Sequence, residues 1–77
     1  MKKLVVSGKE VLKALLKKGF ILVRSKGSHH RLTRVVNGQE FHVTINIHGN
    51  KDLYWPVLKS VIEQSGMLEE EFEEMFK

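Results

Sequence analysis

Residues 29–47 read HHRLTRVVNGQEFHVTINI, and this stretch decides the fold. Asn37-Gly38 is a strong signal for a two-residue hairpin turn. After this turn the side chains alternate without a break, with Phe41, Val43, Ile45 and Ile47 on one face and Glu40, His42, Thr44 and Asn46 on the other. We therefore predict two antiparallel strands, one over residues 29–36 and one from 39 or 40 to 47. The sheet should have one apolar face and one polar face.

The sequence upstream predicts a helix and then a further strand. Ser7-Gly8-Lys9-Glu10 fits the capping box, with Ser7 as the N-cap and Glu10 at the third helical position. Gly19 follows two lysines and should end this helix. Phe20–Arg24 is typical of a strand, and Ser25–Ser28 of the turn after it. The apolar stripe of the helix consists of Val11, Leu12, Leu15 and Leu16.

The sequence downstream predicts two more helices after a polar loop at residues 48–52. Pro56 is suited to the first turn of a helix that Gly66 ends, with Val57, Leu58, Val61 and Ile62 as its apolar stripe. A short C-terminal helix would carry Leu68, Phe72, Met75 and Phe76 on one side. The predicted fold class is α+β: a three-stranded antiparallel sheet with helices on one face, in the order αβββα plus a C-terminal helix.

The charge distribution points to a polyanionic partner. Residues 1–66 hold twelve lysines and arginines against four carboxylates, a balance of +8, whereas residues 67–77 hold five glutamates and one lysine. A basic body of this kind suggests nucleic acid. The acidic tail either packs on the basic body or presents a solvated helix face.

The 77 residues should form a single domain, 1–77, with a core at 7–66 and the acidic helix at 67–77. Cysteine is absent, so the chain offers no thiolate nucleophile and no need for an oxidising compartment. Residues 1–6 lack a full signal peptide, and no apolar run approaches the length of a membrane span. We expect a cytoplasmic protein without a membrane association.

The tetrapeptide Gly27-Ser28-His29-His30 carries the candidate chemistry. Histidine titrates near neutral pH and can both accept and donate a proton. An RNA 2′-hydroxyl can attack its adjacent phosphorus if an imidazole takes the proton and cations stabilise the developing charge, without a metal or other cofactor. Leu32 should face the helices. Because side chains alternate along a strand, His30 should then also point toward the core, and His29 should lie on the opposite, open face of the sheet. The cations near these two histidines are Arg24, Lys26 and Arg31.

His29 is the first choice for proton transfer, and His30 either supports it or is structural. Gly27 either approaches a phosphate closely or is a plain turn glycine, and Ser28 either donates to a phosphate oxygen or caps the turn. His48 is a candidate second proton-transfer group or phosphate contact. Lys51 is either a phosphate contact or a solvated loop lysine.

Three further residues have weaker alternatives. His42 fits a polar strand face, and a zinc site made of His29, His42 and His48 is a minor alternative because few carboxylates lie nearby. Tyr54 and Trp55 could stack on bases, although Trp55 beside Pro56 is more often part of the core.

Several of these motifs together resemble the HicA family of mRNA interferase toxins. They are Ser7-Gly-Lys-Glu, Gly19-Phe, Arg24-x-Lys-Gly-Ser-His-His30, Ile47-His-Gly-Asn-Lys51-Asp-Leu and a closing helix that ends at Gly66. The resemblance implies a fold like that of double-stranded-RNA-binding domains and ribosome-independent cleavage of mRNA by the glycine-serine-histidine motif. It also implies neutralisation by a HicB antitoxin encoded alongside. The matching residues are Gly27, Ser28 and His29, and some members keep the histidine at the position of His30.

The chain departs from the family in two places, the helix start at Tyr54–Val57 and the glutamate-rich tail. The first hypothesis is therefore a toxin endoribonuclease that acts on mRNA without metal. A non-catalytic double-stranded-RNA-binding module is the main alternative, and a small protein-interaction domain with a basic face is a third.

Overall fold

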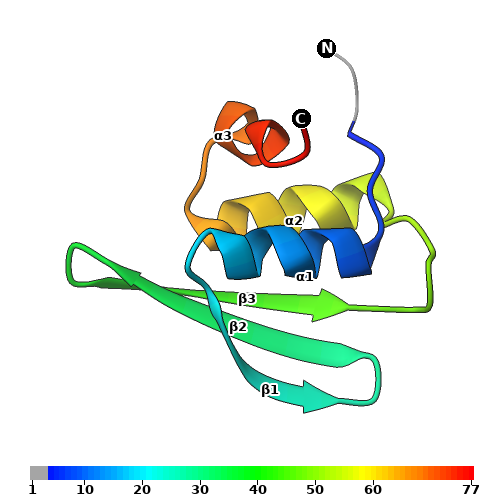
Figure 1. Cartoon of the computed structure of the whole chain (residues 1–77), viewed down its shortest axis with the longest axis horizontal. Coiled ribbons are helices and arrows are strands. Elements are labelled where there is room, and N and C mark those ends of the chain that lie inside the picture. Colours follow the sequence, from blue (N-terminus) through cyan, green and yellow to red (C-terminus); the bar gives the residue numbers. More distant parts are fainter. Residues whose placement is uncertain (1–3) are drawn as a thin grey trace.

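The computed structural model describes residues 4–77 and shows the predicted α+β architecture. The three strands form one antiparallel sheet in the order β1-β2-β3, and all three helices lie on the same side of it (Figure 1). Residues 1–3, which include two of the counted lysines and begin the segment expected to lack a signal peptide, lie outside the described residues. The elements are α1 (Gly8–Lys17), β1 (Ile21–Lys26), β2 (His29–Val36), β3 (Gln39–Asn46), α2 (Trp55–Ser65) and α3 (Glu69–Glu74).

Helix α1 begins at the predicted capping box. The Ser7 hydroxyl accepts from the Glu10 amide at 3.2 Å, and the Ser7 amide donates to Glu10 Oε1 at 2.9 Å. The buried side of α1 is centred on Val11, Ala14 and Leu15. Leu16 was expected in this stripe, but it is 44% exposed because it lies at the margin of the buried side.

Strand β1 starts and ends later than predicted. It spans Ile21–Lys26, so the connection to β2 is the two-residue turn Gly27-Ser28 and not a four-residue turn. Gly27 has φ +59°, a conformation that suits the first central position of a tight hairpin turn. Lys26 therefore pairs with His29 inside the ladder.

A β-bulge interrupts β1 at Val23. Leu22 pairs with Leu32, but the next paired residue of β1 is Arg24, which lies opposite Arg31. Val23 is thus the extra residue, and its insertion moves every later residue of β1 to the other face of the strand.

Strands β2 and β3 pair in the register that the hairpin signal predicts. Leu32 lies opposite Val43 and His30 opposite Ile45, so these positions face the helices. The outer edge of β3 is partly covered, because the Thr44 amide donates to Gln64 Oε1 of α2 at 3.0 Å. Strand β3 ends at Asn46, one residue earlier than predicted.

Helix α2 begins at Trp55, with Pro56 in its first turn, and ends at Gly66 as predicted. Leu58, Val61 and Ile62 are buried, whereas Val57 is 42% exposed and contributes less to the core than expected. Helix α3 contributes Phe72, which is completely buried, while Leu68 at its start is exposed. The acidic helix therefore packs on the body through an apolar side and turns several of its glutamates to solvent.

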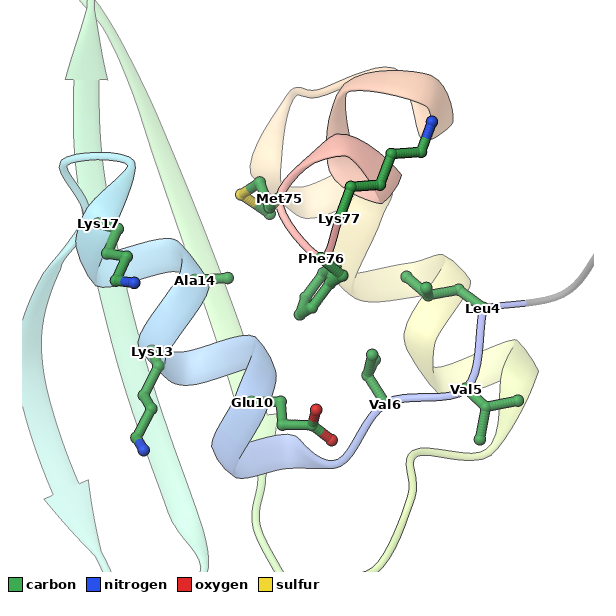
Figure 2. A pocket seen from close by; sticks show the side chains of 10 residues that line it. All are labelled: Leu4, Val5, Val6, Glu10, Lys13, Ala14, Lys17, Met75, Phe76 and Lys77. Atoms are coloured by element: carbon green, nitrogen blue, oxygen red, sulfur yellow. The ribbon is translucent and has the colours of Figure 1, made fainter.

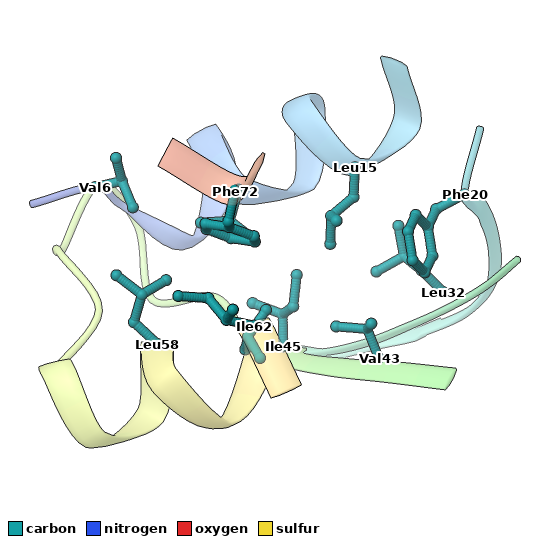
Figure 3. Close-up of a cluster of buried hydrophobic side chains, with 11 residues drawn as sticks. Val6, Leu15, Phe20, Leu32, Val43, Ile45, Leu58, Ile62 and Phe72 are labelled. Atoms are coloured by element: carbon teal, nitrogen blue, oxygen red, sulfur yellow. The ribbon is translucent and has the colours of Figure 1, made fainter. Parts of the chain in front are cut away.

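The core lies between the sheet and the helices (Figure 3). It takes residues from every element except β1, together with Val6 and Phe20. Strand β1 contributes no residue to this core, and all of its residues are exposed. The buried hydrophobic cluster consists of Val6, Val11, Leu15, Phe20, Leu32, Val43, Ile45, Leu58, Val61, Ile62 and Phe72.

Candidate nucleic-acid interface

The open face of the sheet carries two cross-strand rows of polar side chains next to the Gly27-Ser28 turn. The strand pairing defines the rows as Lys26–His29–Asn46 and Arg24–Arg31–Thr44. A hollow of about 170 Å³ lies here, lined by Arg24, Lys26, His29, His30, Arg31 and Thr44. Five of the seven residues that the sequence analysis selected as cations or as part of the histidine motif therefore line one hollow.

The cations of this hollow are free to bind an anion. The ion pairs within residues 4–77 are His42–Glu40 and Lys77–Glu74, so Arg24, Lys26 and Arg31 have no carboxylate partner among the described residues. Clustered basic side chains without carboxylate partners form a positively charged surface that suits phosphate groups.

The bulge at Val23 places two of these cations on the open face. In a regular strand Arg24 and Lys26 would share the face of Leu22, which points toward the helices. Because Val23 is inserted, Arg24 lies opposite Arg31 and Lys26 opposite His29 on the open face. The bulge could not be predicted from the sequence, since Ile-Leu-Val offers no alternation that would mark an extra residue.

The strand phase separates the two histidines as predicted. His29 is exposed and lies between Lys26 and Asn46, whereas His30 is half-buried and lies between Ser25 and Ile45. His30 Nδ1 is 3.0 Å from the carbonyl oxygen of Ser28. A carbonyl only accepts, so this contact requires the proton on Nδ1 and leaves Nε2 as the acceptor in the neutral ring.

The Ser28 carbonyl also holds the turn against β3. It accepts from the Ile47 amide at 2.8 Å in addition to His30 Nδ1. These two bonds fix the peptide between the turn and the two histidines. Gly27 has open space around it, with no atom within 4 Å of the position that a Cβ would take.

His48 and Lys51 do not line the hollow. Both side chains are exposed in the loop after β3, and the Lys51 amide donates to the His48 carbonyl at 3.1 Å. The Ile47–Ser28 bond brings the start of this loop to the turn that precedes His29. Their role as phosphate contacts stays a prediction.

The remaining histidine and the loop aromatics have distinct surroundings. His42 Nε2 lies 3.4 Å from Glu40 Oε1 at the other end of the open face. No group of three His, Asp or Glu side chains within residues 4–77 could hold a metal ion, so the structure does not support the zinc alternative. Trp55 packs against the core, while Tyr54 is exposed.

A larger hollow of about 450 Å³ lies on the helix side of the molecule (Figure 2). It is formed by the segment before α1, by α1 itself and by the end of the chain after α3. None of the selected site residues lines it. Size alone therefore does not identify the functional site.

The sequence matches one known family. The family model described as "HicA toxin of bacterial toxin-antitoxin" matches residues 8–67, and the chain belongs to this family. It is therefore a toxin of a bacterial toxin–antitoxin system, and membership implies an antitoxin partner. No curated protein matches the chain. Within residues 4–77 there is no helix of the length and apolarity that a membrane crossing requires.

Proposed function

We propose that this toxin is an endoribonuclease that cleaves mRNA by histidine acid–base catalysis. The observation that supports this most strongly is the hollow on the open face, where His29 lies beside three cations without carboxylate partners among residues 4–77. A protein that only binds phosphate needs the cations but not an imidazole in their midst. Membership of the HicA family agrees with this activity.

In the proposed reaction His29 acts as the general base. It takes the proton of a 2′-hydroxyl, the oxygen attacks the adjacent phosphorus, and the bond from phosphorus to the 5′-oxygen breaks. A general acid protonates the leaving oxygen, so the products are a 2′,3′-cyclic phosphate and a 5′-hydroxyl. Arg24, Lys26 and Arg31 stabilise the charge that develops on the phosphoryl oxygens.

His30 is the second candidate for proton transfer. Its ring is held by the Ser28 carbonyl, and Nε2 stays available to accept a proton. Gly27 and Ser28 hold the backbone of the turn beside the phosphate, and His48 and Lys51 would extend the contact with RNA from the neighbouring loop. A HicB-type antitoxin would neutralise the toxin.

Cleavage of labelled single-stranded RNA by the purified protein in EDTA tests this function. We expect cleavage by the wild type and a loss of at least about 100-fold in His29→Ala, since general acid–base catalysis contributes about 10²–10⁴-fold. His29→Ala should still bind RNA that carries 2′-O-methyl groups, which shows that the variant is folded. Lys13→Ala, on the helix side, serves as a control for the loss of a cation.

The His30→Ala variant completes the experiment. If His30→Ala is inactive and His29→Ala retains activity, the base is His30 and not His29. Activity that survives in both single variants contradicts the proposed mechanism. RNA binding without cleavage by the wild type contradicts the enzyme and favours the binding module.

A further inference from the structure

The open face continues beyond the cationic hollow in a third cross-strand row. This row consists of Ile21, Thr33 and His42, and it lies directly next to the Arg24–Arg31–Thr44 row. Val35 follows on the same face of β2. Ile21 and Val35 are each 64% exposed, so apolar surface is open to solvent here.

The chemistry of the face changes along the strands. The two rows near the turn contain lysine and arginine, whereas the third row contains no lysine, arginine or carboxylate. Two residues along a strand advance about 6.8 Å, so the three rows extend over about 14 Å. Such a surface suits a ligand that presents phosphate at one end and flat apolar groups at the other.

Single-stranded RNA has this chemistry. Its unpaired bases can be splayed out and laid on aromatic and apolar side chains, whereas a duplex keeps its bases stacked inside. The His42 side chain, whose Nε2 lies 3.4 Å from Glu40 Oε1, is 45% exposed and offers a flat ring to solvent. Ile21 lies opposite Thr33 on β1, and Val35 lies two residues beyond Thr33 on β2; both side chains are branched and exposed.

We infer that the Ile21–Thr33–His42 row is a base-binding subsite for single-stranded RNA, adjacent to the hollow that holds the phosphates. This inference rests on the proposed function, because it places a base of the same RNA beside the scissile phosphate. His42 stacks on the base and Ile21 packs beside it. The subsite selects unpaired RNA over duplex RNA.

The test measures binding of a labelled 2′-O-methyl RNA octamer, which cannot be cleaved by attack of a 2′-hydroxyl. We expect the double variant Ile21→Ser/His42→Ala to raise the Kd at least about 5-fold, the lower end of what loss of one stacked base costs. Its salt dependence should keep the wild-type slope, because counterion release depends on the cations. Arg24→Ala should instead reduce that slope.

Two controls make the measurement specific. Val5→Ser changes an exposed apolar residue in the segment before α1, away from the open face, and should leave the Kd unchanged. A 2′-O-methyl duplex of the same sequence should bind the wild type and the double variant equally. Thermal unfolding shows whether the double variant remains folded.

The outcomes separate this inference from the proposed function. An unchanged Kd in the double variant, or an equal loss on the duplex, overturns the subsite even if the wild type cleaves RNA. Loss of antitoxin binding without loss of RNA affinity also overturns it, because the face would then be a protein contact. A 5-fold loss on single strands supports the subsite even if no cleavage is found.

Discussion

Gly66 lies where the end of α2 packs against the Phe41 ring of β3, and only glycine fits this position. It ends α2 with φ +76°, and a Cβ at this position would clash with Phe41 Cε1 and lie 2.7 Å from two other atoms of that ring. The ring of a β3 residue therefore packs directly on the backbone of the helix end. Both the backbone conformation and the space require glycine.

Gly66→Ala should lower the free energy of unfolding by about 2–5 kcal/mol, because the strained backbone costs about 1–2 kcal/mol and displacement of a packed ring about 1–3 kcal/mol. Denaturant unfolding measures this change. Gly38→Ala is the matched control, with φ +80° and no atom within 4 Å of a new Cβ. Equal losses in the two variants would contradict a role of the Phe41 contact.

At the scale of elements, the bulge in β1 determines what the open face presents. With Val23 removed, Arg24 would follow Leu22 directly and would still lie opposite Arg31. Without the bulge but with Val23 in place, Arg24 would turn toward the helices. The composition of the interface therefore depends on the phase of one edge strand.

We expect deletion of Val23 to leave RNA affinity within about 3-fold of the wild type, because the later residues of β1 keep their faces in the regular ladder. Deletion of Ser25 should weaken RNA binding at least about 10-fold, because it moves Lys26 off the open face and disturbs the tight turn. Binding of 2′-O-methyl RNA measures both effects. Loss of affinity in a folded Val23 deletion would show that this strand keeps a different register.

Most helices and strands could be predicted from the sequence because the signals that define them act between neighbouring residues. The alternation of residues 40–47, the Asn37-Gly38 turn and the Ser7 capping box each depend on neighbouring residues, and all three are present. The bulge was missed because it depends on how β1 pairs with β2. Leu16 and Val57 were assigned to the core because helical spacing does not define the margins of a buried face.

The candidate site was predicted in composition and only partly in arrangement. Strand phase correctly placed His29 on the open face with Arg31. The contact between His30 and the Ser28 carbonyl could not be expected. It depends on the side-chain rotamer of His30 beside a turn that was predicted to have four residues and has two. The catalytic roles remain predictions.

For the whole molecule, α3 is a structural part of the fold. Phe72 is completely buried in the common core, and its ring centroid lies 5.5 Å from that of Phe76. A chain of this size has a small core and stability of only a few kcal/mol to spare. The acidic helix lies on the side of the molecule opposite the open face (Figure 1) and leaves that face uncovered.

Phe72→Ala should destabilise the protein by about 3–5 kcal/mol, the usual cost of truncating a buried aromatic residue. Leu68→Ala, which changes an exposed residue at the start of α3, should cost less than about 1 kcal/mol. Thermal unfolding of both variants checks this. A small effect of Phe72→Ala would mean that residues 4–66 are stable without α3.

The Gln64–Thr44 bond and the bulge at Val23 have a joint consequence for the behaviour of the isolated toxin. A sheet with two free edges can recruit strands from other molecules and aggregate. Here a side-chain amide occupies a backbone donor on the edge of β3, and an extra residue interrupts the edge of β1 next to two cations. Each edge therefore has one point at which a strand from another molecule cannot pair regularly, which disfavours aggregation of the isolated toxin through its sheet.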